Sequence, residues 1–439
     1  DKGCMTMFVS DCLGLNELGH LTIGGCDTVA LAQKYGTPLY VMDEDEIRRA
    51  CASYRGSIER YYGGRGLVTY ASKAFCCKAA CKIAAEEGLG LDVVSGGELY
   101  TAISANFPAE RIFFHGNNKT VQELTEALAY GVGQIVVDNF DELETLNQLA
   151  LSRGEPANIL FRIKPGIDAH THDFVRTGQI DSKFGLALET GEAMRAVQTA
   201  LSMQGVRLRG VHCHIGSQIF DIEPFEHAAE VMLGFTADVR DQTGCELEIL
   251  DLGGGFGIKY LPEHDPVEYD RYMQRVARTV QRVSAARGVK TPFIVIEPGR
   301  SIAGPAGVTL YTAGAVKEIP GVRTYVSIDG GMCDNPRYIL YRSEYEAMVA
   351  NKASQPKTRT VTLAGKCCES GDLIGEGMQI QDVHPGDIIA VLATGAYNYA
   401  MSSNYNRIPR PPVVMLRGGQ ARVVVKRETY EDLVRNDLE

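Results

Sequence analysis

The sequence has no tryptophan and no apolar run of the length that a membrane-spanning helix needs. Such a helix takes about 20 mostly apolar residues. Positive charge is also scarce, because 44 Lys and Arg stand against 55 Asp and Glu, which gives a formal net charge of -11. Nucleic acids and anionic membranes are bound by basic surfaces. The composition therefore argues against both as partners, although it allows a local cationic pocket for a small acid.

The 12 cysteines of the 439-residue chain include no CxxC pair, which argues against zinc-ribbon and thioredoxin-like sites. Two pairs are adjacent in sequence, at 76–77 and 367–368. Residues 1–11 lack the basic flank and apolar core of a signal peptide. We therefore expect free thiols in a reducing compartment and a cytoplasmic protein.

Eight short apolar runs recur through the first two-thirds of the chain. They are residues 67–72, 90–95, 111–116, 134–139, 158–165, 208–216, 246–255 and 293–299. Continuous apolar runs are typical of strands that are buried on both faces. Amphipathic stretches of helical length separate them, which predicts an α/β fold with a (β/α)8 TIM-type barrel over residues 44–305. An open doubly wound sheet could use the same units.

The pattern changes after residue 305. Short strand-like runs punctuated by Gly and Pro predict a second, mainly antiparallel β domain over 306–439. Residues 5–43 also contain strand-like runs, and we expect this segment to join the β domain. The polar stretch 168–183 follows a predicted strand and is a candidate active-site loop.

Polar residues end every predicted barrel strand, and in a barrel these ends meet on the rim that carries the chemistry. Lys73 ends the first strand, where it could be a Schiff-base nucleophile or an ordinary ion-pair partner. The glycines of 253–257 could approach a phosphate closely or form a tight turn. Glu297 could hold a protonated pyridine nitrogen, and Arg300 could bind a carboxylate or phosphate. These two could equally form a structural ion pair.

Two other site types are disfavoured. The glycines at 253–257 do not fit GxGxxG, and no GxxxxGK[ST] occurs, so the Rossmann and P-loop interpretations fail. His212 and His214 would share one strand face, yet no third ligand cluster is evident. We therefore predict no metal site, with one of these histidines in the core and the other facing the active site.

Taken together, seven motifs closely resemble the diaminopimelate decarboxylase family, pyridoxal-phosphate enzymes of the alanine-racemase and ornithine-decarboxylase fold group. They are YASKA around Lys73, HIGSQ at 214–218, GGGFG at 253–257, EPGRS at 297–301, DGGMCDNPR at 329–337, CES at 368–370 and GAYNYAM at 395–401. The resemblance runs from about His20 to Arg407, in the family's order. It implies decarboxylation of meso-2,6-diaminopimelate to L-lysine, the last step of lysine biosynthesis, by a homodimer with shared active sites.

The resemblance also implies residue roles. Lys73 would bind the pyridoxal 5'-phosphate aldehyde, His214 would stack on the pyridine ring, and Glu297 would pair with its nitrogen. The other implied cofactor-binding residues are Asp92, Ser217, Gly253, Gly254, Gly255, Gly299, Arg300 and Tyr397. Cys368 would protonate Cα. The implied substrate-binding residues are Arg300, Arg337, Tyr341, Tyr397 and, from the partner subunit, Glu369.

One local departure and three alternatives stay open. Tyr338 follows DNPR where the family usually has Pro, although Arg337 and Tyr341 keep their spacing. The chain could instead be a decarboxylase of another basic amino acid (ornithine, lysine or arginine), whose relatives carry Asp-centred motifs in place of CES. It could also be a non-catalytic pyridoxal-phosphate-binding protein, or a racemase, which needs a second base.

Overall fold

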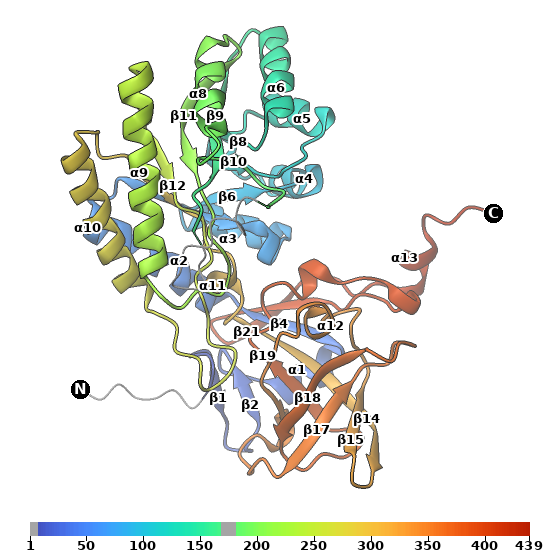
Figure 1. The fold of residues 1–439 in the computed structure, drawn as a ribbon. Coiled ribbons are helices and arrows are strands. Elements are labelled where there is room, and N and C mark those ends of the chain that lie inside the picture. The colour runs from blue at the N-terminus through green and yellow to red at the C-terminus, as the bar shows by residue number, and fades with distance from the viewer. Residues whose placement is uncertain (1–7, 168–180) are drawn as a thin grey trace. The chain divides into compact units, whose positions relative to one another are not determined.

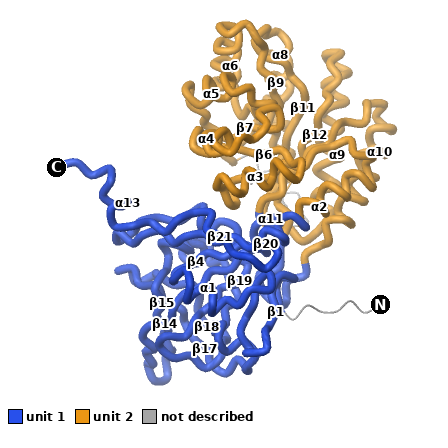
Figure 2. The backbone as a smooth tube through the Cα atoms, turned by 180° about the vertical axis from the view of Figure 1, so that it is seen from behind, with its two compact units in different colours: residues 1–49, 258–265, 300–439 blue, residues 50–257, 266–299 orange. Residues whose placement is uncertain are grey.

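The structure is a computed structural model that describes residues 8–167 and 181–439. It contains two compact units, which Figure 1 shows as a ribbon and Figure 2 colours separately. The barrel unit comprises residues 50–257 and 266–299, and the β unit comprises the described residues up to 49 together with 258–265 and 300–439. Residues 168–180 of the candidate active-site loop lie outside the described part of the chain.

The barrel unit is built on eight parallel strands that close into a ring. In chain order they are β5 (Gly66–Ala71), β6 (Gly90–Val93), β7 (Ile112–Phe114), β8 (Gln134–Val137), β9 (Ala157–Lys164), β11 (Val206–His212), β12 (Ile249–Asp251) and β13 (Phe293–Ile296). Each pairs with the next and β13 pairs with β5, which closes the barrel. A two-residue strand, β10 (Leu186–Ala187), adds to β9. The predicted barrel is confirmed, and each of the eight predicted runs overlaps one of its strands.

Helices surround the strands (Figure 1), and all but the first, which precedes β5, follow a strand of the barrel. They are α2 (Glu44–Tyr62), α3 (Lys78–Glu86), α4 (Gly96–Ser104), α5 (Val121–Tyr130), α6 (Phe140–Arg153), α8 (Glu192–Ser202), α9 (Glu223–Thr243) and α10 (Tyr269–Arg287). Local signals fix their starts, as at α5, where Thr120 and Glu123 form a capping box. Among the described helices, none is both long and apolar enough to cross a membrane.

Side chains from five strands fill the barrel's interior. Phe113, Val136, Leu160, Ile249 and Val295 form one buried cluster, with Leu67 packed against it. A barrel filled in this way is a solid core rather than a pore, so its chemistry is confined to the rim where the strands end.

The β unit contains a nine-stranded sheet in which most neighbouring strands are antiparallel, as predicted. Its strands are β4 (Leu39–Asp43), β14 (Gly307–Ile319), β15 (Arg323–Ile328), β16 (Ala347–Val349), β17 (Arg359–Ala364), β18 (Leu373–Ile380), β19 (Ile388–Leu392), β20 (Val413–Arg417) and β21 (Gln420–Val425). The N-terminal strand β4 pairs with β14 and β20, so the chain's start is part of this sheet. A small sheet of β1 (Leu13–Leu15), β2 (Leu21–Ile23) and β3 (Cys26–Asp27) accompanies it.

The compact units divide the chain differently in detail from the predicted domains. Residues 44–49, 258–265 and 300–305 belong to the β unit by their contacts, whereas the prediction places them in the barrel. The boundary at 49/50 falls inside α2, a continuous helix. We keep 44–305 against 5–43 and 306–439 as a proposal about folding domains.

Candidate active site

Lys73 is the exposed residue at the end of β5. It lies in a short 3-10 turn, Ser72–Ala74, between two buried neighbours. The Ser72 hydroxyl donates to the Asp92 carbonyl at 2.7 Å, and the Tyr70 hydroxyl donates to the Phe75 carbonyl at 2.7 Å. These bonds fix the turn on both sides. The lysine amine is thus presented from a rigid support at the rim.

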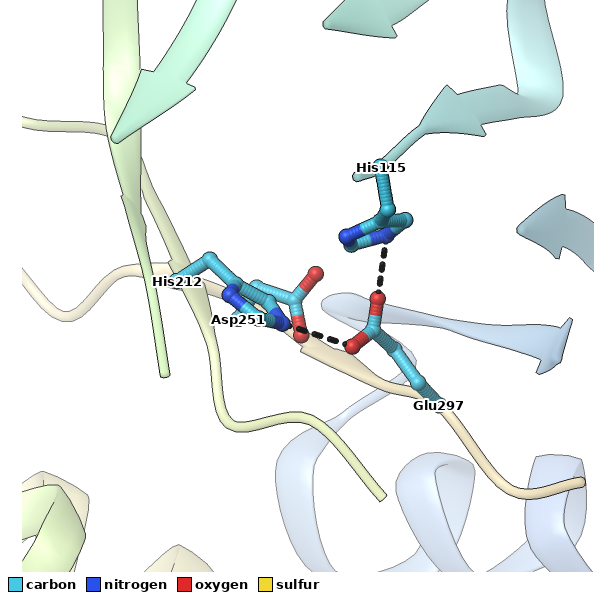
Figure 3. A group of neighbouring side chains, drawn as sticks. All are labelled: His115, His212, Asp251 and Glu297. Carbon is cyan, nitrogen blue, oxygen red and sulfur yellow. Dashed lines mark hydrogen bonds and ion pairs between the residues drawn. The ribbon is translucent and has the colours of Figure 1, made fainter. Parts of the chain in front are cut away.

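A buried cluster of carboxylates and imidazoles occupies the ends of four barrel strands (Figure 3). Glu297 follows β13 and lies between His115, which follows β7, and His212, the last residue of β11. Its two oxygens are 2.7 Å from His115 Nε2 and 2.8 Å from His212 Nε2. The side chains are no more than 8% exposed. Asp251, the last residue of β12, completes the group.

The cluster keeps Glu297 ionised despite its burial. Desolvation would raise the pKa of Glu297, but His115 and His212 hold it well below its usual value. Desolvation likewise opposes a charge on His115, yet Glu297 and Asp92 raise its pKa to about 9. Burial dominates at His212 and lowers its pKa to about 4. At neutral pH the group is therefore a Glu297 carboxylate between a charged and a neutral imidazole.

The pKa values of the two carboxyl groups near Glu297, those of Asp92 and Asp251, are raised, whereas that of Glu297 is lowered. Desolvation, then repulsion from Glu297, raises the pKa of Asp92 to about 7. The same two causes raise the pKa of Asp251 well above its usual value. Asp251 Oδ1 accepts the Gly253 N–H at 2.9 Å, which joins the cluster to the glycine turn. Shifted titratable groups on a barrel rim mark a functional site.

His115, His212, Asp251 and Glu297 also have ligand atoms within 4.8 Å of one another, close enough for a metal ion. Both oxygens of Glu297 already pair with imidazoles, however, and that pairing accounts for the cluster without an ion. The absence of a metal stays a prediction.

The glycine turn brings three strand ends into close backbone contact. A Cβ on Gly254 would lie 2.2 Å from the Glu297 carbonyl oxygen, and one on Gly255 would lie 2.3 Å from the Gly216 carbonyl oxygen. Gly253 and Gly255 have φ of 69° and 101°, which favour glycine. Only glycine fits here, and bare backbone is what a phosphate-binding turn requires. Ser217 follows Gly216 directly in the sequence.

His214 lies against this turn. Its Nδ1 accepts the Gly254 N–H at 3.3 Å. Burial, and then the charge of Lys73, lower the pKa of His214 to about 3, so it is neutral at ordinary pH. A neutral imidazole beside a lysine fits contact with an aromatic ring better than an ion pair. Gly299 is equally confined, since its Cβ would lie 2.9 Å from the Ala71 Cβ.

The β unit carries a separate group of cations and tyrosines. The guanidinium of Arg300 lies 4.7 Å from the centre of the Tyr397 ring, and its Nη1 donates to the Tyr260 hydroxyl at 2.5 Å. Arg337 begins the short helix α12 (Arg337–Tyr341) and lies 5.2 Å from the same Tyr397 ring and 4.9 Å from Tyr341. Its Nη2 reaches Ser343 Oγ at 3.5 Å, while its buried Nε has no hydrogen-bond partner among the described residues.

Arg337 pairs with no carboxylate within residues 8–167 and 181–439, so its charge is available to an anionic ligand. Cys368 and Glu369 are exposed in the same unit. The Cys368 N–H donates to Asn406 Oδ1 at 2.7 Å, which fixes the backbone beneath the thiol. Neighbouring Cys367 is buried, and desolvation followed by Asp372 raises its pKa to about 11. Of the two adjacent thiols, Cys368 is the accessible one.

The predicted residues thus fall into two groups. The barrel unit holds Lys73, Asp92, His214, Ser217, Gly253, Gly254, Gly255, Glu297 and Gly299, and the β unit holds Arg300, Arg337, Tyr341, Cys368, Glu369 and Tyr397. The sequence interpretation gave no role to His115 or Asp251, and it did not connect His212 with Glu297. The available signal was their position at the ends of predicted strands.

Comparisons with known proteins find relatives that match nearly the whole chain. Residues 44–304 match the family model for the pyridoxal-binding domain of pyridoxal-dependent decarboxylases. The chain is 50% identical to the diaminopimelate decarboxylase of Bacillus subtilis, over 98% of each chain. It is 45% identical to that of Mycobacterium tuberculosis (strain ATCC 25618 / H37Rv), over 95% of each. The structure of the diaminopimelate decarboxylase of M. jannaschii in complex with L-lysine matches with a TM-score of 0.93 and 36% identity, over 99% of each chain.

Proposed function

The chain belongs to the diaminopimelate decarboxylase family of pyridoxal-phosphate-dependent carboxy-lyases, and we propose how its residues divide the work of converting meso-2,6-diaminopimelate to L-lysine and CO2. The observation that carries this proposal is the buried, ionised Glu297 at the end of β13. A carboxylate held in this state is the partner that a protonated pyridine nitrogen requires.

The residues at the barrel rim fit pyridoxal 5'-phosphate. Lys73 offers an accessible amine, the turn at 253–255 offers bare backbone, and buried Asp251 keeps one oxygen without a hydrogen-bond donor among the described residues. When bound, the cofactor supplies an electron-withdrawing ring that takes up the electron pair left when the bond to CO2 breaks. Lys73 would bind its aldehyde carbon, and His214 would lie against its ring.

The remaining cofactor contacts follow from the same fit. Ser217, the glycine turn, Gly299 and the Arg300 backbone would hold the phosphate, with Tyr397 beside it. Asp92 would support the cluster that binds the cofactor ring, because its Oδ1 lies 3.5 Å from His115 Nε2.

Substrate binding falls to the cations of the β unit. Arg300 and Arg337 would bind the carboxylate that is not lost, assisted by Tyr341 and Tyr397. The planar guanidinium forms two parallel hydrogen bonds to a carboxylate, which fixes the substrate's orientation as well as its charge. A substrate without this second carboxylate would leave Arg337 unpaired, and sites built around such a group reject analogues lacking it by about 10^4.

Cys368 and Glu369 would act on the active site of a partner subunit, which makes the enzyme a homodimer. Cys368 would deliver a proton to Cα after CO2 leaves, and Glu369 would bind the distal ammonium group. Their exposure in the single chain supports this assignment. We also propose a cytoplasmic location, because all 11 described cysteines are free and several of them neighbour one another.

The deciding experiment measures CO2 release by the purified protein with pyridoxal 5'-phosphate. Meso-diaminopimelate is compared with L-ornithine, L-lysine and L-arginine at equal concentrations. Release from meso-diaminopimelate alone, with an equal amount of lysine, is expected. Release from a monocarboxylate alone would overturn the roles of Arg337 and Glu369 and favour another basic amino acid. Cofactor binding without release from any substrate would favour a non-catalytic binding protein.

A further inference from the structure

His115 is a buried histidine placed between two carboxylates, and the roles proposed above do not use it. Its Nε2 lies 2.7 Å from Glu297 Oε2 and 3.5 Å from Asp92 Oδ1, and its side chain is 8% exposed. Its ring meets that of His212 edge-on, with centroids 5.0 Å apart. Figure 3 shows His115 directed at one oxygen of Glu297, while His212 reaches the other from a different strand.

An ionised carboxylate in this environment requires a nearby cation. Burying an isolated charge is strongly unfavourable, and the group then takes up a proton instead. His212 helps to lower the pKa of Glu297 but supplies no charge at neutral pH, because burial lowers its own pKa to about 4. His115 does, because Glu297 and Asp92 together outweigh its desolvation. The other titratable groups whose charge acts on His115 or Glu297 are Glu98, Arg162, His212, Cys213, His214 and Asp251.

We infer that His115 is a positioning residue whose imidazolium keeps the Glu297 carboxylate ionised and fixes its orientation, so that Glu297 can hold the protonated ring nitrogen of the cofactor. The inference rests on the proposed function for the identity of that ring and goes beyond it in assigning His115. A carboxylate has about four lone-pair sites. His115 and His212 occupy two of these, so sites remain for the ring N–H.

Two substitutions separate the charge of His115 from its hydrogen bond. His115→Gln keeps an N–H donor near the position of Nε2 and removes the charge, whereas His115→Phe removes both. His227→Gln is the matched control, since His227 also lies beside a glutamate, Glu230, but on the partly exposed face of α9. If the charge matters, the glutamine variant will behave like the phenylalanine variant.

The first measurement needs no activity. The full chain, freed of cofactor and labelled at its 9 histidines, is titrated by NMR. One imidazole is expected to titrate near pH 9, to disappear in His115→Gln and to move to lower pH in Glu297→Gln. The inference is wrong if no histidine of the wild-type protein titrates above pH 8.

The second measurement is the dissociation constant for pyridoxal 5'-phosphate at pH 7.5. His115→Gln should raise it about tenfold or more, since one pKa unit of Glu297 corresponds to a factor of ten. His227→Gln should stay within about twofold of the wild type. The double variant His115→Gln/Glu297→Gln should bind no more weakly than Glu297→Gln alone, because His115 acts through Glu297. Additive losses would assign His115 a merely structural role.

The two proposals fail in different ways. If the wild type releases CO2 from meso-diaminopimelate while His115→Gln keeps wild-type cofactor affinity, the role of His115 is wrong and the function stands. If His115 titrates near pH 9 and supports cofactor binding, yet no diaminopimelate is consumed, the function is wrong and the role of His115 stands.

Discussion

The guanidinium of Arg337 lies 5.2 Å from the centre of the Tyr397 ring, which also lies 4.7 Å from the guanidinium of Arg300. An aromatic face attracts a cation without neutralising it. The shared ring therefore places two positive charges near each other without neutralising either. Tyr397 reaches this position from a backbone φ of 61°, an uncommon conformation for a residue with a side chain. Strain of this kind is found at binding sites that need one fixed geometry.

Replacing Arg337 by lysine should raise the KM for meso-diaminopimelate by about tenfold or more, with a smaller effect on kcat. Lysine keeps the charge but cannot form the paired hydrogen bonds that a carboxylate receives from arginine. Steady-state kinetics measure this split. The control is Arg342→Lys, close in sequence but 73% exposed in its side chain, which should leave KM unchanged. An unchanged KM in Arg337→Lys would remove Arg337 from the substrate site.

Lys73→Ala should abolish covalent attachment of the cofactor. Borohydride reduction of the wild-type holoenzyme, followed by peptide mapping, is expected to place the reduced cofactor on the peptide that contains Lys73. Lys82→Ala, on α3 with a 72% exposed side chain, should be labelled like the wild type. Label on a different lysine in the wild type would contradict the assignment.

The barrel could be predicted because each of its strands is buried on both faces and therefore continuous in apolar residues. Several strands of the β unit, for which the sequence predicts only a strand-rich region, lack that pattern. β18 contains two glycines and exposes part of its length, and β16 has only three residues. β20 follows a proline-rich stretch that reads as loop. Pairing with neighbouring strands, rather than local sequence, makes these segments strands.

The sequence motifs predicted which residues form the site, but they did not predict which of these residues contact one another. Lys73, the glycine turn and Glu297 each follow an apolar run in a recognisable motif. The bond from His212 to Glu297 joins residues 85 positions apart, and barrel closure decides which strand ends meet. The burial that shifts the pKa of His115 is likewise a property of the assembled rim. The spacing of residues along the sequence predicts neither the pairing of His212 with Glu297 nor the burial of His115.

Cys368→Ala should bind the cofactor normally and lose most turnover, because the group that delivers the proton to Cα is gone. General acids of this kind contribute about 10^2 to 10^4 in rate. The adjacent Cys367→Ala is the matched control. Its thiol is buried, so this variant should keep its turnover and lose about 1 kcal/mol of stability. Equal turnover losses in both variants, measured as CO2 release, would contradict the assignment.

Acid should destabilise the barrel unit through His214. In the unfolded chain a histidine takes up a proton below about pH 6.5, but burial and Lys73 keep His214 neutral in the fold down to about pH 3. The stability that His214 contributes to the fold is therefore fully present above about pH 6.5 and decreases as the pH falls below it. When the pH falls from 7 to 5, the free energy of unfolding of the wild type should therefore decrease by about 2 kcal/mol more than that of His214→Asn. Urea unfolding of the cofactor-free protein at both values measures this, and the more exposed His227→Asn should show a much smaller change.

Gly254→Ala tests the glycine turn through both stability and cofactor binding. The new methyl group would lie 2.2 Å from the Glu297 carbonyl oxygen, a backbone atom, so the end of β13 must shift. Overpacking of this kind is unfavourable by about 1–3 kcal/mol, and the shift also displaces the carboxylate that would hold the cofactor ring. Gly56→Ala is the opposite case in the same unit. Gly56 lies within α2 with nothing near its missing Cβ, so alanine should stabilise the fold by about 0.5–1 kcal/mol. Urea midpoints and cofactor dissociation constants separate the two, and wild-type affinity in Gly254→Ala would show that the turn does not bind the cofactor.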